Sequence, residues 1–285
     1  MPPHLNGRTC VVTGANRGIG RATAEGLAHL GAELVLLCRR REDGDKVASA
    51  ISAQGRGRPD VVEVDLSSQE SIRRAAQELG QRYPRLDVLI NNAGIIPPTR
   101  EVTVDGLEMQ FAVNHMAYFL LTNLLLPQLE AAAPSRIISV SSGAHAHAAI
   151  DFEDLQSERG YDPRDTYSRT KLANVLFTYE LARRLAGTGV TANCLNPGVV
   201  ETGMLADYMG VPRTRGASSR TFGATPAEGA ETSIYLASAP EMGGVTGKYF
   251  ERKRAIRSSR ESYDEAAARR LWEVSERLAK LSAVR

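Results

Sequence analysis

The chain has 285 residues, of which 42% are apolar, and its 35 basic and 33 acidic side chains leave a formal net charge of +2. This length and composition are enough for one large domain, or two small ones, with a substantial core. The near balance of charge gives no reason to expect nucleic acid or an anionic membrane as a partner.

Apolar runs rich in β-branched residues alternate with helical patterns along the chain. Strands are predicted at 9–13, 33–38, 60–64, 86–90, 135–140 and 190–195, and helices at 19–30, 43–54, 69–81, 106–129, from residue 167 or before to 185, and 225–238. Strands that are apolar throughout are typical of a parallel sheet covered on both faces. We therefore predict an α/β fold, a single-domain, doubly wound (Rossmann-like) parallel sheet with helices on both faces.

Two long stretches, 143–166 and 203–224, interrupt this alternation. Long loops at the carboxyl ends of strands are where such sheets bind ligands; the alternative is that they are surface loops without function. The tail from Glu251 is a short basic run followed by a helix near 262–281, whose apolar residues Leu271, Trp272, Val274, Leu278 and Leu281 lie near one stripe. We predict a domain over 1–250 and a helical extension over 251–285 that packs on it as a lid or interface element.

The three cysteines, Cys10, Cys38 and Cys194, are scattered and lie in or beside apolar strands. Such placement predicts buried free thiols in a reducing compartment rather than a disulfide framework. The first strand begins at Thr9, which leaves no room for a signal peptide. The longest apolar stretch, 116–127, is too short to cross a bilayer. We expect a cytoplasmic protein with no membrane partner.

A glycine-rich loop, Thr13-Gly14-Ala15-Asn16-Arg17-Gly18-Ile19-Gly20, follows the first strand and opens the first helix. Glycine permits a tight turn and a close approach of the backbone to a pyrophosphate, whose charge is favoured by a helix N-terminus. In this context the loop predicts a dinucleotide cofactor.

The second strand ends in Cys38-Arg39-Arg40-Arg41, with no acidic residue before Glu42. An acidic residue there would bind the adenosine 2′-hydroxyl and repel a 2′-phosphate, whereas an arginine accommodates the phosphate. Arg17 adds a second guanidinium within the glycine loop. The pattern favours NADP(H); the alternative is that these arginines form a solvated charge run.

Tyr167 and Lys171 are four residues apart and share one face of a predicted helix. A phenol has an unperturbed pKa of about 10. A nearby ammonium, and the charge of an oxidised nicotinamide, favour the phenolate, so we expect the pKa of Tyr167 to be lowered. Tyr-x-x-x-Lys alone is a weak signal, but downstream of the glycine loop it predicts a proton-transfer tyrosine.

These motifs resemble the short-chain dehydrogenase/reductase family, in which Thr-Gly-x-x-x-Gly-x-Gly is the signature. Further landmarks stand in the family's order, namely Asp65, Asn91-Asn92-Ala93-Gly94, Asn114, Ser141-Ser142 and Asn196-Pro197-Gly198-Val199-Val200-Glu201-Thr202. The resemblance covers roughly residues 7–250, so it implies that the domain over 1–250 is a Rossmann-type NADP(H)-binding catalytic domain.

The resemblance also implies roles for single residues. Tyr167 is implied to be the general acid/base, Lys171 to tune it and hold the nicotinamide ribose, and Ser142 to orient the substrate oxygen. Asn114 is implied to hold a water that links Lys171 to solvent, and Asp65 to contact adenine. With the arginines above, the residues expected to bind the cofactor are Gly14, Asn16, Arg17, Gly18, Ile19, Gly20, Arg39, Arg40, Asp65, Leu66, Asn92, Ala93, Gly94, Tyr167, Lys171, Pro197, Gly198, Val200 and Thr202.

The loop 143–166, with Asp154-Leu155-Gln156-Ser157-Glu158 and the stretches 171–177 and 269–275, resembles the retinol dehydrogenases and their relatives. Animal retinol dehydrogenases commonly carry an N-terminal hydrophobic anchor that this sequence does not show, which leaves the retinoid itself open. The loop 203–224 contains apolar residues, Met204, Leu205, Tyr208, Met209 and Val211, that suggest a lipophilic substrate. Its arginines, Arg213, Arg215 and Arg220, either face solvent or meet an anionic group.

We therefore predict an NADP(H)-dependent oxidoreductase that transfers a hydride between nicotinamide and a small-molecule carbonyl or alcohol. The alternative is a catalytically silent NADP(H)-binding sensor or scaffold. An epimerase of the extended branch is disfavoured, because that branch spaces its loop Gly-x-x-Gly-x-x-Gly.

His145 and His147 invite a metal interpretation, but no acidic or cysteine cluster has ligand spacing with them. We expect exposed loop histidines and no metal. The small-residue helix 225–238 resembles the family's assembly helix, and 106–129 is apolar enough to bury a second face, so we predict a homodimer or homotetramer. A monomer results if the tail covers that surface.

Overall fold

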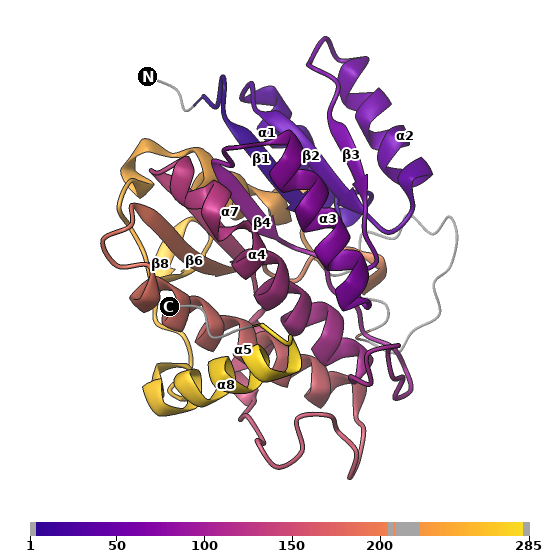
Figure 1. The fold of residues 1–285 in the computed structure, drawn as a ribbon, viewed down its shortest axis with the longest axis vertical. Helices are drawn as coiled ribbons and strands as arrows, with labels where there is room; N and C mark the ends of the chain where they lie inside the picture. Colours follow the sequence, from indigo (N-terminus) through magenta and orange to yellow (C-terminus); the bar gives the residue numbers. More distant parts are fainter. Residues whose placement is uncertain (1–3, 205–207, 209–222, 282–285) are drawn as a thin grey trace.

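The structure is a computed structural model that describes residues 4–204, 208 and 223–281 (Figure 1). Leu205, Met209, Val211, Arg213, Arg215 and Arg220, which carried part of the substrate prediction, lie outside the described residues.

An eight-stranded sheet in the order β3-β2-β1-β4-β5-β6-β7-β8 forms the centre of the molecule. Its strands are β1 Thr9–Thr13, β2 Glu33–Cys38, β3 Asp60–Glu63, β4 Val88–Asn91, β5 Ser135–Val140, β6 Val190–Asn196, β7 Tyr249–Glu251 and β8 Arg254–Ile256. Every neighbouring pair is parallel except β7–β8, which is antiparallel. The order reverses between β1 and β4, which is the point where doubly wound sheets bind their ligands.

Helices cover both faces of this sheet. They are α1 Gly18–His29, α2 Arg41–Ser52, α3 Gln69–Arg82, α4 Ala117–Ala131, α5 Pro163–Arg184, α7 Pro226–Ser238 and α8 Glu265–Leu278. Because side chains alternate along a strand, Val11 packs into one core with α3, α4 and α5, while Cys10 and Val12 pack into the other with α1, α2 and α7. Figure 1 shows α3 beside α4, and α8 against α5. The predicted doubly wound α/β fold is confirmed.

The long helix predicted over 106–129 begins later and differently. A π-helical turn, Phe111–Met116, precedes α4. The buried carboxylate of Glu108 sets this start, because it accepts hydrogen bonds from the backbone N–H groups of Gln110 at 2.8 Å and Phe111 at 2.7 Å. The prediction read the apolar run as one α-helix, whereas the π turn rotates the residues of its own segment, among them Asn114, relative to a regular helix.

The β7–β8 hairpin was not predicted. Its turn residues, Arg252 and Lys253, have left-handed φ angles of 48° and 64°. A two-residue turn of that kind is normally signalled by Asn-Gly or Asp-Gly, so the basic run gave no hairpin signal. Beyond the hairpin, α8 packs on α5, and no helix within the described residues is long and apolar enough to cross a membrane. The division of the chain at residue 250 stays a prediction.

Candidate active site

The carboxyl ends of the parallel strands open into one large cleft of about 1580 Å³. Its wall contains every predicted catalytic or cofactor residue except Arg40 and Asn114. The glycine loop forms one side of the cleft, and Ser142, Tyr167 and Lys171 form another. The structure therefore brings together residues that are up to 188 positions apart in the sequence, from Gly14 to Thr202.

The glycine loop leaves room for a group held against the backbone. Gly14 and Gly18 have φ angles of +66° and +54°, and a Cβ on Gly20 would lie 2.4 Å from the carbonyl oxygen of Gly14. The N-cap residue of α1, Arg17, makes no capping hydrogen bond through its side chain, and the first turn has no acidic residue. In contrast, α2, α3, α5, α7 and α8 each carry an acidic residue there. The N–H groups of α1 thus fit an anionic pyrophosphate.

Thr13 connects this loop to the end of β4. Its hydroxyl accepts hydrogen bonds from the backbone N–H of Asn92 at 2.8 Å and of Ala93 at 3.0 Å, and the side chain of Asn92 donates to the Thr13 carbonyl at 2.8 Å. The Tyr118 hydroxyl donates to the Ala93 carbonyl at 2.8 Å. Neither Thr13 nor Tyr118 was predicted to have a role of its own, because the contacts that define these roles are non-local.

The arginines near the adenosine end of the cleft differ in their surroundings. Arg17 and Arg39 are exposed, line the cleft and have no acidic partner among the described residues. Arg40 lies outside the cleft wall and forms an ion pair with Asp43 at 2.6 Å in the first turn of α2. Asp65 lines the cleft, and its carboxylate accepts hydrogen bonds from the N–H and hydroxyl of Ser67.

The catalytic side is built on α5. Tyr167 is 8% exposed and Lys171 is 2% exposed. The ammonium nitrogen of Lys171 lies 5.3 Å from the centroid of the Tyr167 ring and donates to the carbonyl of Val140 at 3.1 Å. The Tyr167 hydroxyl lies 3.8 Å from the sulfur of Met204. Ser142 follows β5, and its hydroxyl accepts from the N–H of Ala144 at 3.2 Å.

Burial controls the protonation of both groups on α5. Burial raises the pKa of Tyr167 to about 12, although a hydrogen bond with Ser142 opposes this rise. Burial lowers the pKa of Lys171 to about 7. The expectation that the pKa of Tyr167 is lowered is therefore wrong for the protein's own residues, whose combined effect raises it. Desolvation of the buried phenolate is the largest cause of this rise.

Asn114 supports the cleft from behind its wall. Its side-chain oxygen accepts from the N–H of Ile95 at 2.8 Å, and its amide nitrogen donates to the Ile95 carbonyl at 3.0 Å and to the Thr170 hydroxyl at 3.2 Å. A Cβ on Gly94 would lie 3.4 Å from the Asn114 oxygen and 3.6 Å from the Lys171 nitrogen. Asn114 therefore fixes the loop after β4 to α5, close to Lys171.

The expectation of exposed histidines is wrong for His145, which is 3% exposed. The short 3-10 helix Gly143–His147 turns His145 inward, where its ring lies 4.7 Å from that of Tyr249. His147 is exposed, as expected, and lines the cleft. In the described parts of the chain, no three His, Cys, Asp or Glu side chains lie together in a way that could hold a metal ion. The prediction of buried free thiols is confirmed for all three cysteines.

The cleft wall also has an apolar part. Its members are Ile95, Ile96, Pro97, Pro98, Met109, Val113, Val199, Met204 and Tyr208. The ring of Tyr208 lies 5.7 Å from that of Tyr167. Of these, only Met204 and Tyr208 were predicted from the sequence to contact the substrate, although the apolar run after Gly94 was a signal that could have been used.

A glycine loop at the end of β1 and a buried Tyr–Lys pair on α5, at one cleft, are the features of the short-chain dehydrogenases. The chain belongs to this family, because the family model for short chain dehydrogenases matches residues 8–209.

Comparison with individual proteins shows which members of the family this chain resembles. It is 47% identical to retinol dehydrogenase 14 from Mus musculus, over 96% of this chain and 86% of that protein, and 45% identical to retinol dehydrogenase 13 from Homo sapiens, over 98% and 86%. Among solved structures, an uncharacterized protein from Mycobacterium Paratuberculosis superposes with a TM-score of 0.81 at 35% identity, covering 98% of this chain and 95% of that one. The NADP active-site complex of RhlG from Pseudomonas aeruginosa has a TM-score of 0.70 at 30% identity, covering 87% and 95%. The chain is thus a retinol dehydrogenase-like oxidoreductase of this family.

Proposed function

We propose that the protein is an NADP(H)-dependent oxidoreductase of the alcohol dehydrogenase or carbonyl reductase type, which acts on a carbonyl or alcohol group of a lipophilic substrate. The observation that carries this proposal is the position of the Tyr167 phenol, beside Lys171 in the wall of the same cleft that contains the glycine loop and the apolar residues above. A substrate oxygen bound there would meet the hydroxyls of Tyr167 and Ser142.

The nicotinamide, when bound, supplies or accepts the hydride. The chain's own residues handle the proton and the charge. Because burial raises the pKa of Tyr167 to about 12, its phenol carries a proton at neutral pH and is ready to donate it to an oxygen that gains negative charge. Ser142 offers a second hydroxyl to the same oxygen, which stabilises that charge. Lys171 stabilises the phenolate left behind.

NADP(H) is the proposed cofactor because Arg17 and Arg39 are exposed at the cleft without an acidic partner among the described residues. Guanidinium groups of this kind suit the 2′-phosphate. Arg40 contributes less, since Asp43 already neutralises it. The NADP complex of the Pseudomonas aeruginosa neighbour supports the same choice.

A lipophilic substrate, a retinoid among the candidates, is supported by the apolar wall and by the similarity to retinol dehydrogenases. The three buried thiols support a reducing compartment such as the cytoplasm. We further propose assembly into a homodimer or homotetramer through α7, because α8 covers the aromatic face of α4 and α5 within the chain. A single mass near 30.9 kDa by light scattering at all concentrations would contradict this assembly.

The decisive experiment is a screen of aldehydes, ketones and alcohols that follows the absorbance of the reduced nicotinamide, repeated with Tyr167→Phe. We expect this variant to lose at least about a hundredfold in kcat, the low end for general acid–base catalysis, while its Kd for NADPH changes little. Tyr83→Phe, which removes a phenol hydroxyl outside the cleft wall, is the matched control. NADPH binding without turnover of any compound would favour the sensor alternative instead.

A further inference from the structure

The segment that follows the β7–β8 hairpin is connected to the candidate active site by hydrogen bonds through two buried histidines. This C-terminal segment, defined here as Ser258–Leu278, contains Ser259 and Ser275. Each of these serines hydrogen-bonds one histidine, His145 for Ser259 and His115 for Ser275. His115 is 0% exposed and His145 is 3% exposed, and neither lines the cleft.

The first connection runs through His115 to Asn114. The amide nitrogen of Asn174 donates to the backbone carbonyl of Asn114 at 2.8 Å, which turns the Asn174 oxygen toward His115 Nδ1 at 3.4 Å. Nδ1 must therefore carry the ring proton and donate it. Nε2 is then an acceptor, and the Ser275 hydroxyl donates to it at 3.0 Å. All four residues are 0% exposed, so water cannot replace a broken link.

The second connection runs through His145 to Ser142 and has the same polarity. The backbone N–H of Ser259 donates to His145 Nε2 at 3.1 Å, so this nitrogen is unprotonated. His145 Nδ1 therefore carries the proton and donates it to the backbone carbonyl of Ser142 at 2.7 Å. Both connections thus begin at a serine of the C-terminal segment, pass through an Nδ1–H imidazole and end at the carbonyl of a proposed site residue.

We propose that His115 and His145 are positioning residues, through which the C-terminal segment holds Asn114 and Ser142 in their working geometry. This inference rests on the function proposed above. In each connection the hydrogen bonds run in one direction, so each bond polarises the next. A change in the C-terminal segment therefore alters the hydrogen bond accepted by the backbone carbonyl of Asn114 or Ser142. Burial lowers the pKa of His115 to about 4 and also lowers the pKa of His145, which keeps both rings neutral as these hydrogen bonds require.

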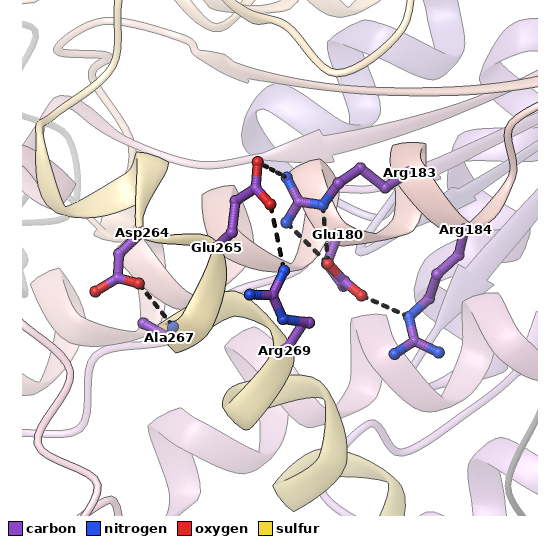
Figure 2. A network of polar contacts seen from close by, with 7 residues as sticks. All are labelled: Glu180, Arg183, Arg184, Asp264, Glu265, Ala267 and Arg269. Atoms are coloured by element: carbon purple, nitrogen blue, oxygen red, sulfur yellow. Dashed lines mark hydrogen bonds and ion pairs between the residues drawn. The ribbon is translucent and has the colours of Figure 1, made fainter.

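The segment is itself attached firmly enough to serve as the fixed end. Trp272 stacks on Phe177 with ring centroids 5.8 Å apart and meets Phe119 edge-on at 4.9 Å. Figure 2 shows the polar contacts at the start of α8, where Glu265 lies between Arg183 and Arg269. In the same view, Asp264 caps the helix through the N–H of Ala267, at 2.9 Å. Aromatic stacking and a capped helix start thus fix Ser275 relative to α5.

The first test is Ser275→Ala in the full-length enzyme. We expect kcat to fall about fivefold, the equivalent of one hydrogen bond, with KM and the Kd for NADPH unchanged within about twofold. Ser233→Ala is the matched control, because Ser233 is equally buried in α7 and its hydroxyl has no partner within the described structure. An unchanged kcat in Ser275→Ala, with turnover that still depends on Tyr167, would overturn the inference and leave the proposed function standing.

The second test separates positioning from general destabilisation. His115→Asn keeps an N–H near the position of Nδ1, facing Asn174, but nothing that reaches Ser275. If His115 transmits the effect, Ser275→Ala should change kcat no further in this background. Effects on kcat that multiply would overturn the inference, because they would show that Ser275 acts without His115.

A third readout needs no turnover. Nitrogen-15 spectra of the imidazoles should show Nδ1–H tautomers for His115 and His145, and Ser275→Ala should shift both the His115 ring nitrogens and the Asn114 side-chain amide. An Nε2–H tautomer at His115, or an Asn114 amide that does not respond, would overturn the inference even if no substrate were found.

Discussion

The two sides of the cleft are built by different means. On the β1–α1 side, the groups offered to a ligand belong to the backbone, namely the turn at Gly14, the close approach at Gly20 and the N–H groups that open α1. On the β5–α5 side they are buried side chains, Tyr167 and Lys171, whose properties depend on neighbours distant in the sequence. A backbone site tolerates little added volume, whereas a side-chain site is sensitive to the loss of single polar atoms.

Gly20→Ala should produce the largest effect on the backbone side. Its Cβ would meet the Gly14 carbonyl at 2.4 Å, and a backbone oxygen cannot give way without moving the loop. We expect the Kd for NADPH, measured by fluorescence titration, to rise at least about thirtyfold, which corresponds to roughly 2 kcal/mol. Gly26→Ala on the same helix is the control, because its Cβ meets the flexible end of Ile234 at 2.3 Å. Equal losses in both variants would mean that helix damage, rather than the loop, is responsible.

Acid should lower the free energy of unfolding through His115, which supports the side of the cleft built from buried side chains. Its pKa is lowered from 6.5 to about 4 in the folded protein, so the unfolded chain binds the extra proton first as the pH falls. The contribution of neutral His115 to the free energy of unfolding is therefore fully present above about pH 6.5 and is lost between pH 6.5 and 4. Below pH 4 this group causes no further change. The loss is on the order of 3 kcal/mol, since one pKa unit is about 1.4 kcal/mol. Urea unfolding at several pH values measures it, and His115→Asn should flatten the curve.

Arg39→Asp should alter selectivity without affecting catalysis. A charge-assisted contact to phosphate contributes roughly 1.5–3 kcal/mol, and a tenfold preference needs only about 1.4. We expect the unaltered protein to bind NADPH at least about tenfold more tightly than NADH, and Arg39→Asp to abolish or invert that preference. The same replacement at Arg41 is the control. Equal affinities of the unaltered protein for the two cofactors would show that these arginines face solvent.

Glu265→Gln should have the smallest effect. Its carboxylate lies 4.0 Å from Arg183 and 3.2 Å from Arg269, and both pairs are well exposed. Exposed ion pairs contribute about 0–1 kcal/mol, so thermal unfolding should change little and kcat not at all. A large loss of kcat would show that the charges at the start of α8, rather than the buried histidines, connect this helix to the site.

The same contrast explains what could be predicted from the sequence. The glycine loop and the strands around it follow from local spacing, so β1 and β2 were placed with their observed bounds. The pKa of Tyr167 depends on desolvation by a finished core, and the inward turn of His145 depends on Tyr249 and Ser259, 104 and 114 residues away. Residues that line one cleft were therefore identified from the sequence, whereas their protonation and the contacts that support them were not.

The β7–β8 hairpin has a consequence for how copies of this chain can meet. By adding an antiparallel strand outside β7, it makes β8 the edge of the sheet, and all three β8 residues are exposed. Arg254 on that edge and Arg252 in the adjoining turn carry positive charge, whereas Lys253 is ion-paired with Glu231 at 2.7 Å. This charge repels an identical edge and hinders strand-to-strand pairing between molecules. A continuous sheet across two copies is thereby disfavoured, and the protein is protected from edge-to-edge aggregation at high concentration.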